Sequence, residues 1–248
     1  MKKSEKKERA DILLERAGSC SSREEAAKLI LSGKVRIGKD HLVRKTSELY
    51  PADTEFIVAE DSQYVSRGAY KLLPAIDKYL PDMSGLIALD VGASTGGFTD
   101  LMLQHNTRRV YTVDSGRGQL HLKIRSDERV VVHEQTNARL LKENFIPEKV
   151  DVITMDLSFI SVTAVLPAVS AFLKKEAWAF ILIKPQFEAS KNEIEKGGVV
   201  REQNVIDKCI EKVSVFCEKE LSWIKKDIIP SPIKGPKGNQ EYIAVFRT

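Results

Sequence analysis

The sequence contains few cysteines, few histidines and no long hydrophobic run. Its three cysteines, Cys20, Cys209 and Cys217, show neither a paired framework nor metal-ligand spacing. We therefore expect reduced thiols, as in cytoplasmic proteins. The four histidines are scattered along the chain, so no metal site is predicted.

Long apolar segments are also missing. The longest uninterrupted run, Ala177–Ile183, has seven residues, whereas a helix that crosses a bilayer needs about 20. The basic N-terminus is not followed by an apolar core, which argues against a secretory signal. We expect a soluble, cytoplasmic protein with no membrane partner.

The overall composition is that of a globular protein. Apolar residues make up 42% of the chain and charged residues 30%, which excludes disordered, collagen-like and low-complexity classes. Lys and Arg number 39 and Asp and Glu 35, so the net charge is 39 − 35 = +4. This balance permits a polyanionic partner but does not require one.

The pattern changes near residue 60, which suggests two domains. Apolar spacing predicts a helix over residues 8–17, and Ser22 is a suitable N-cap for a second helix. Alternation around residues 38–40 predicts a hairpin, and residues 49–58 supply one more strand. We predict a small α+β domain, a linker and a larger domain, with the limits 1–60, 61–66 and 67–248.

Cationic residues recur in the smaller domain, and anionic residues lie among them. Nucleic-acid affinity requires clustered cations. A solvated, mixed-charge surface is therefore the alternative to an RNA-binding face.

The larger domain alternates strands with helices. Its apolar runs are 86–91, 110–113, 130–132, 150–155, 178–183, 224–229 and 242–246. Connections such as Ser161–Leu173 are long enough for crossover helices, so we predict a doubly covered, mostly parallel sheet of seven strands. The linker 230–239 has no room for a helix, so the last strand is expected to return antiparallel.

A loop of small residues follows the first run of the larger domain. Gly92, Gly96 and Gly97 permit close approach to a ligand at a helix N-terminus. Ser94 stands where a dinucleotide fingerprint has its second glycine, and Asp90 at the strand end would repel phosphate. A carboxylate suits a cationic ligand such as S-adenosylmethionine, and a tight turn without a ligand is the alternative.

Further polar residues follow the other strands. Asp114 occupies the position that conventionally binds ribose hydroxyls, and Asn137 is either an adenine contact or a turn or helix cap. Asp156 and Lys184 end the fourth and fifth strands, where open α/β sheets bind ligands. Their alternative is a structural ion pair.

Together these residues resemble a known family. The stretches Arg9–Asp11, Ser22–Ala26 and Gly33–Val35 resemble the S4-type RNA-binding domain. The run Asp90–Asp100, with Asp156–Phe159, Lys184–Glu188 and Gly197–Arg201, is similar to TlyA-type ribosomal RNA methyltransferases. These belong to the FtsJ-like ribose 2′-O-methyltransferases, some of which are labelled hemolysins.

The resemblance implies specific site residues. Its Lys-Asp-Lys-Glu tetrad falls on Lys71, Asp156, Lys184 and Glu241. The implied cofactor contacts are Asp90, Gly92, Ala93, Ser94, Gly96, Gly97, Phe98, Asp114, Asn137, Asp156, Leu157 and Phe159. The expected RNA contacts are Arg9, Arg23, Lys34, Arg36 and Arg67.

The resemblance implies a Rossmann-like methyltransferase with an N-terminal S4-like domain. It would transfer a methyl group from S-adenosyl-L-methionine to a cytidine 2′-hydroxyl of 23S ribosomal RNA, free or in a ribosomal subunit. 16S ribosomal RNA is an alternative target. A non-catalytic RNA-binding protein and a pore-forming hemolysin are the competing classes, although no apolar or strongly amphipathic insertion segment is evident.

Overall fold

The computed structural model describes residues 7–38, 41–58, 63–142 and 144–248. The chain forms two compact units, residues 1–63 and 64–248. The division falls inside the predicted linker 61–66, of which residues 61 and 62 lie outside the described residues. We call the two parts the N-terminal and the C-terminal unit and describe each by itself.

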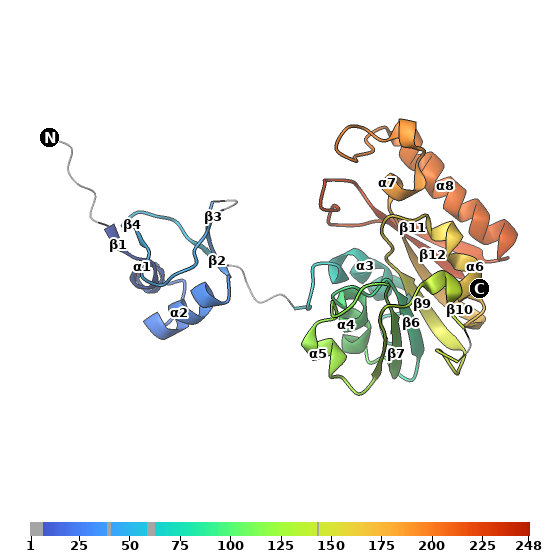
Figure 1. Ribbon diagram of the computed structural model, residues 1–248, viewed down its shortest axis with the longest axis horizontal. Helices are drawn as coiled ribbons and strands as arrows, with labels where there is room; N and C mark the ends of the chain where they lie inside the picture. Colours follow the sequence, from blue (N-terminus) through green and yellow to red (C-terminus); the bar gives the residue numbers. More distant parts are fainter. Residues whose placement is uncertain (1–6, 39–40, 59–62, 143) are drawn as a thin grey trace. The chain divides into compact units, whose positions relative to one another are not determined.

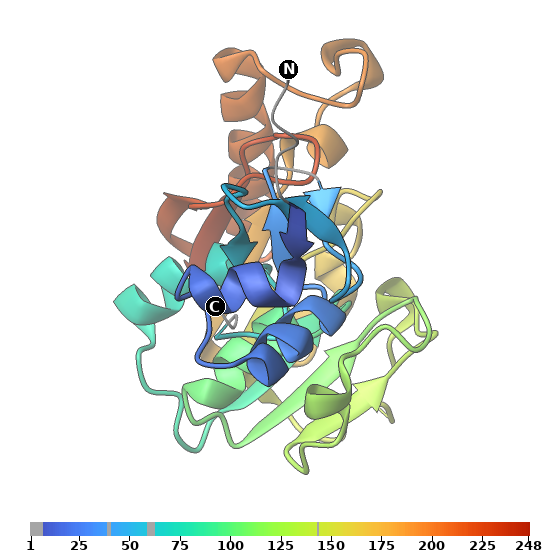
Figure 2. The same cartoon turned by 90° about the vertical axis from the view of Figure 1, so that its left-hand side faces the viewer.

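The N-terminal unit combines two short helices with short strands (Figure 1). Its elements are β1 (Lys7–Arg9), α1 (Ala10–Arg16), α2 (Arg23–Leu31), β2 (Val35–Ile37), β3 (His41–Leu42), β4 (Leu49–Pro51) and β5 (Ile57–Val58). The helices lie side by side (Figure 2), and Leu14 and Ile30 are buried between them and the strands. The predicted hairpin is present as the antiparallel pair β2 and β3, and the turn residues 39 and 40 lie outside the described residues.

The single strand predicted over residues 49–58 is wrong. A turn closed by a hydrogen bond from Thr54 N to Pro51 O, 3.1 Å long, divides the segment. The first half, β4, pairs with β1, and the second half, β5, pairs with β2. The apolar pattern is the same for one strand or two, so it does not locate the turn.

The C-terminal unit contains a sheet of seven strands in the order β11-β12-β10-β9-β6-β7-β8. The strands are β6 (Ile87–Val91), β7 (Arg109–Val113), β8 (Val130–His133), β9 (Val150–Met155), β10 (Leu173–Ile183), β11 (Ile224–Pro230) and β12 (Tyr242–Arg247). Strands β6 to β10 run parallel to one another, and β12 is antiparallel to both β10 and β11. The predicted fold class, including the antiparallel last strand, is confirmed.

Both faces of this sheet are buried. Alternate residues of one strand point to opposite faces, and the strands contribute to two separate cores. Leu89 and Ile153 belong to the core that includes α8 (Gln203–Glu220). Their neighbours Ala88 and Val152 belong to the core that includes α3 (Ala69–Tyr79) and α4 (Gly97–Gln104). Helices therefore cover each face, as continuous apolar strands require.

The connection over residues 161–173, which was expected to hold a crossover helix, does not form one continuous helix. The segment 161–173 forms a 3₁₀ turn, Val162–Ala164, and then α6 (Leu166–Ser170). Pro167 lies in the first turn of α6, where its missing N–H costs nothing; inside a longer helix it would remove a hydrogen bond. The remaining helices are α5 (Leu122–Arg125), α7 (Pro185–Glu188) and the 3₁₀ turns Ala138–Leu140 and Lys191–Glu193. None of the helices described is both long and apolar enough to span a membrane.

The cap of α2 provides a test of the N-terminal unit. Ser22 Oγ accepts a hydrogen bond from Glu25 N at 3.2 Å. Ser22→Ala leaves that N–H without its partner, and we expect the opening free energy of α2 to fall by about 1 kcal/mol. Hydrogen–deuterium exchange of the α2 amides in the full chain measures this. Replacing the exposed Ser19 by Ala is the control, and equal exchange in both variants would contradict the assignment of the cap.

Candidate active site

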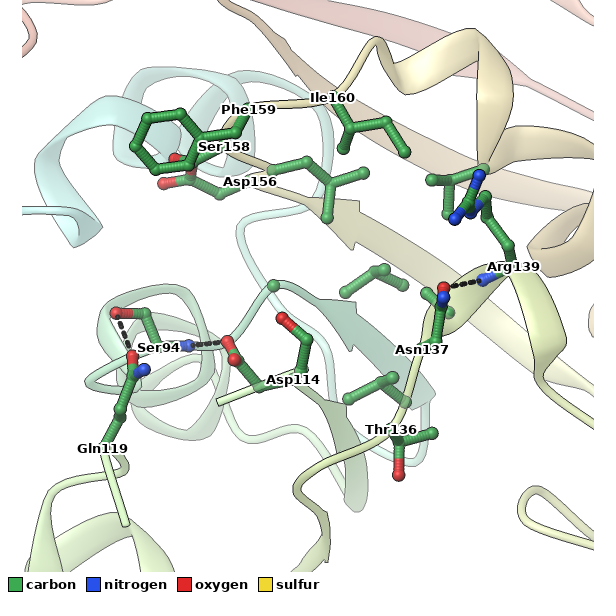
Figure 3. A pocket seen from close by; sticks show the side chains of 17 residues that line it. Ser94, Asp114, Gln119, Thr136, Asn137, Arg139, Asp156, Ser158, Phe159 and Ile160 are labelled. Carbon is green, nitrogen blue, oxygen red and sulfur yellow. Dashed lines mark hydrogen bonds between the residues drawn. The ribbon is translucent and has the colours of Figure 1, made fainter. Parts of the chain in front are cut away.

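The main cavity of the C-terminal unit lies at the carboxyl ends of β6, β7, β8 and β9 (Figure 3). Its volume is about 430 Å³, and the loops that follow these strands line it. A second cavity of about 90 Å³ shares Gly92, Ser94 and Asp156 with the first. It extends to Ser66 and to Gly97 at the start of α4.

Two glycines allow the walls of these cavities to approach each other. Gly92 has φ +84°, and a Cβ there would lie 2.4 Å from Asp156 O. A Cβ on Gly97 would lie 2.5 Å from Ser66 Oγ and 3.0 Å from Ala69 N. Since real Cβ atoms do not make such contacts, both positions require glycine. The loop after β6 therefore contacts both the end of β9 and the segment before α3.

Asp90 does not reach either cavity. Its side chain has no exposed surface, and its two carboxylate oxygens accept hydrogen bonds from Thr99 Oγ1 at 2.6 Å and Thr154 Oγ1 at 2.8 Å. Burial raises the pKa of the Asp90 carboxyl to about 6, although both hydrogen bonds act in the opposite direction. The structure therefore does not bring Asp90 to a ligand, contrary to the sequence-based expectation. It joins β6 to α4 and β9.

Asp114 does line the main cavity, at the end of β7. Its Oδ2 accepts a hydrogen bond from Ser94 N at 2.8 Å, and its Oδ1 accepts one from Gly116 N at 2.7 Å. The carboxylate is half-buried, and each oxygen keeps a lone pair for a ligand. Ser94 itself has φ +48° and is exposed. Asp114 thus fixes the exposed loop after β6 against the loop after β7.

Asn137 lines the cavity opposite Asp114 (Figure 3). Its Oδ1 accepts a hydrogen bond from Arg139 N at 3.1 Å, so it caps the 3₁₀ turn that follows. Asn137 therefore acts as a helix cap, one of the two roles expected from the sequence. Its amide nitrogen remains available to a ligand. Leu157 and Phe159 also line the main cavity. Ala93, Gly97 and Phe98 line the smaller one. Gly96, with φ +93°, caps the start of α4.

The four tetrad residues come together from four separate elements. Lys71 comes from α3, Asp156 follows β9, Lys184 follows β10 and Glu241 precedes β12. Lys184 Nζ lies 2.5 Å from Asp156 Oδ1, and Lys71 Nζ lies 2.7 Å from Glu241 Oε2 and 3.9 Å from Asp156 Oδ2. The side chains of both lysines are close to nine-tenths buried. The result is a compact cluster of two cations and two anions beside the cavities.

Two residues of this cluster were not predicted from the sequence. Ser158 Oγ accepts a hydrogen bond from Lys184 Nζ at 3.0 Å, and Gln186 Nε2 donates to Glu241 Oε1 at 3.4 Å. Each lies two residues from a tetrad residue in the same loop, so proximity in sequence was the available signal. Phe159 has φ +65°, and its side chain is 91% exposed beside the main cavity.

The predicted RNA contacts lie in both units. Arg9 and Arg23 both pair with the buried Asp11, at 2.8 and 3.4 Å, and the hydrogen bond from Arg9 lowers the pKa of that carboxyl. Arg36 is exposed on β2, and Lys34 is half-buried just before it. Arg67 is exposed in the segment before α3. In the parts of the chain that the structure describes, no group of three or more His, Cys, Asp or Glu could hold a metal ion.

The fold and the site together define a class of enzyme. A seven-stranded sheet with an antiparallel last strand, a glycine loop after β6 and an acidic residue ending β7 form a Rossmann-like methyltransferase. The FtsJ-like methyltransferase family matches residues 64–248, and the S4 domain matches residues 8–41. The chain therefore belongs to the FtsJ-like methyltransferases and carries an S4 domain, which confirms the expected enzyme class and its cofactor, S-adenosyl-L-methionine.

Individual relatives resemble the chain over nearly its whole length. The 16S/23S rRNA (cytidine-2′-O)-methyltransferase TlyA of Mycobacterium tuberculosis is 40% identical over 97% of this chain and 90% of its own. Hemolysin A of Brachyspira hyodysenteriae is 38% identical over 96% and 99%. A structure described as a hemolysin from Streptococcus thermophilus has a TM-score of 0.74 and 36% identity, covering 99% of this chain and 90% of that one.

Asp90 is buried with only neutral hydroxyl partners, and this leads to a prediction about the pH dependence of stability. Because its pKa is higher in the folded chain than the usual 3.8, the folded state binds more protons between pH 3.8 and about 6. Its contribution to the free energy of unfolding then decreases as the pH rises through that range, by about 3 kcal/mol. Asp90→Asn keeps the shape and cannot ionise. We expect the variant to match the wild type near pH 4 and to be more stable near pH 7.

Urea unfolding of both proteins across this range measures the difference. Glu128→Gln, at an exposed carboxylate of the same unit, is the control. A difference between Asp90→Asn and the wild type that does not change with pH would contradict the assignment.

Proposed function

We propose that the protein methylates the ribose 2′-hydroxyl of a cytidine in 23S ribosomal RNA. The observation that carries this proposal is the ion-pair cluster of Lys71, Asp156, Lys184 and Glu241 beside the cofactor cavity. The names of two relatives support the substrate: the Mycobacterium tuberculosis protein is a 16S/23S and the Campylobacter jejuni protein a 23S rRNA (cytidine-2′-O)-methyltransferase. 16S ribosomal RNA is a further target to test. Because ribosomal RNA is cytoplasmic in bacteria, the proposal includes a cytoplasmic location.

The two cavities suit the two halves of S-adenosylmethionine. The larger one offers Asp114 for ribose hydroxyls and the Asn137 amide nitrogen for adenine. The smaller one ends at the start of α4, whose first N–H groups attract a carboxylate. Asp156 lines both cavities and so marks their junction. When bound, the cofactor supplies an electrophilic methyl group.

The cluster can activate a ribose hydroxyl, which is a poor nucleophile near neutral pH. Lys184 faces Asp156 and Ser158. As an ammonium it has no lone pair with which to accept a proton, so it donates to the 2′-oxygen and stabilises the developing negative charge. Asp156 Oδ1 pairs with Lys184, whereas Asp156 Oδ2 lies 3.9 Å from Lys71 Nζ, and the residue lines both cavities. We assign Oδ2 to receive the hydroxyl proton.

Lys71 and Glu241 complete the geometry. The Glu241 side chain is almost fully buried and pairs with Lys71 at 2.7 Å. It thereby fixes the ammonium of Lys71 beside Asp156, where positioning of the reacting groups contributes much of the rate. A Cβ on Gly235 would lie 2.5 Å from Glu241 Oε1, so this glycine is needed to keep the carboxylate in place.

Residues of both units offer contacts to RNA. The exposed ring of Phe159 offers a face on which an unpaired base can stack, which favours an RNA contact over a cofactor contact for this residue. The S4 domain supplies exposed cations such as Arg36. Such contacts with phosphates give affinity that falls with rising salt.

Lys184→Ala tests the chemistry. The variant loses the donor that faces the 2′-oxygen, so we expect methyl transfer to fall by about a thousandfold while cofactor affinity stays nearly unchanged. The measurements are transfer of labelled methyl groups to large ribosomal subunits from a bacterium that lacks the gene, and cofactor calorimetry. Lys174→Ala, at the opposite end of β10 and paired with Asp151, is the matched control. An active Lys184→Ala enzyme would remove the assignment.

Arg36→Ala tests the RNA contact. Loss of one phosphate contact should weaken RNA binding about equally for all sequences. The slope of log affinity against log salt should also become shallower by about 1. Filter binding of 23S ribosomal RNA at several salt concentrations measures both. Lys225→Ala on the sheet edge β11 is the control, and an unchanged slope for Arg36→Ala would exclude a phosphate contact there.

A further inference from the structure

Glu188 is a buried carboxylate outside the tetrad. Its side chain is 1% exposed, and both of its oxygens are occupied. Oε1 accepts a hydrogen bond from Val162 N at 2.8 Å, and Oε2 accepts bonds from Ser161 Oγ at 2.5 Å and Lys212 Nζ at 2.9 Å. Removing a carboxylate from water costs free energy unless the charge is paired and hydrogen-bonded. Glu188 meets both conditions, so its contacts join three separate segments of the chain.

The position of Glu188 relates it to the reacting groups. It is the last residue of the α7 turn that begins directly after Lys184. Its partners Ser161 and Val162 end the loop that begins at Asp156. The two loops are therefore joined twice: near the strands by the Asp156–Lys184 ion pair, and at their far ends by Glu188. A closed ring of contacts of this kind fixes the distance between the loops.

Two aromatic side chains lie between these joins. The rings of Phe159 and Phe187 are 5.2 Å apart between centroids, and Lys184 Nζ lies 5.8 Å from the ring centre of Phe187. Phe159 has φ +65°, which is strained for a bulky residue and persists only where the surroundings enforce it. Glu188 provides that restraint two residues further along, by holding Ser161.

Lys212 completes the ring from a different part of the fold. It comes from α8, which contributes no residue to either cavity. Its ammonium donates to Glu188 Oε2 and also to Glu188 O at 3.0 Å, so it fixes the carboxyl end of α7 and neutralises the carboxylate. The anchor of the two loops thus lies outside both cavities.

We propose that Glu188 and Lys212 are positioning residues that hold the Asp156–Ser161 and Lys184–Glu188 loops at the separation needed for methyl transfer to RNA. This rests on the proposed function. The pair touches neither Asp114 nor Asn137, so these two keep their own hydrogen bonds when it is lost, although residues 156–160 of the held loop also line the main cavity. Misplacement of reacting groups by about 1 Å can cost a hundredfold in rate, and that loss should appear in the transfer step.

Glu188→Gln is the first test. The new amide oxygen can still accept from Val162 N, but the amide NH₂ then faces the ammonium of Lys212, donor against donor. We expect the single-turnover transfer rate at saturating RNA and saturating cofactor to fall about 10- to 100-fold, with a much smaller loss of cofactor affinity because Asp114 and Asn137 keep their own partners.

Rescue separates positioning from loss of stability. In Glu188→Gln with Lys212→Met the two donors no longer oppose each other, and we expect at least part of the rate to return relative to Glu188→Gln. Val213→Ala removes buried volume from the same helix without touching the pair, and it should lower the melting temperature without lowering the rate. A purely structural role would give rates that follow the melting temperature in all three variants, the double variant included.

The outcomes distinguish this proposal from the one on which it rests. If the wild type itself transfers no methyl group to ribosomal subunits or to 23S ribosomal RNA, the proposed function fails. If the wild type is active and Glu188→Gln transfers at the same rate, the positioning role is wrong and the proposed function stands.

Discussion

The close contact between Gly92 and the main chain of Asp156 sets the spacing of the whole site. With φ +84° and no side chain, Gly92 lets the loop after β6 reach the end of β9, where Asp156 N donates to Val91 O at 3.0 Å. Asp156 is thereby placed where the two cavities meet and where the ion-pair cluster begins. Any side chain at position 92 would force these two loops apart and separate the main cavity from Lys71 and Lys184.

The sequence predicted the sheet well because parallel strands buried on both faces appear as continuous apolar runs. It predicted connections poorly, since the same pattern fits one strand or two over residues 49–58. The segment 161–173 is likewise divided, into a 3₁₀ turn and a short helix with Pro167 in its first turn. The position of a turn depends on hydrogen bonds between residues far apart in the sequence, and local residue patterns give little indication of such bonds.

Residue types at the strand ends were recognised, but their directions were not. Asp90 and Asp114 are both carboxylates ending adjacent parallel strands, and the sequence treats them alike. In the structure Asp114 faces the cavity, whereas Asp90 points into the core toward Thr99 and Thr154. Glu188 illustrates the converse. Its position in the Lys184–Glu188 motif was noted, but its partner Lys212 is 24 residues away, and spacing gives no indication of that pairing.

Charge matching explains how so many ionisable groups are accommodated beside one cavity. Three buried or half-buried carboxylates at the two loops each pair with a lysine: Glu241 with Lys71, Asp156 with Lys184 and Glu188 with Lys212. Asp90 is the exception: its hydrogen-bond partners are neutral hydroxyls, and burial raises its pKa although both hydrogen bonds lower it.

A neutral reactive cluster offers little long-range attraction to a phosphate backbone, because equal numbers of opposite charges at contact distance cancel beyond a few ångströms. The attraction for RNA must then come from residues outside it. The exposed cations of the S4 domain, and Arg67 before α3, are residues of that kind. On this argument the chain separates its tasks physically. On the proposed function, exposed surface cations would set how tightly RNA is held, and the three ion pairs would position the reacting ribose.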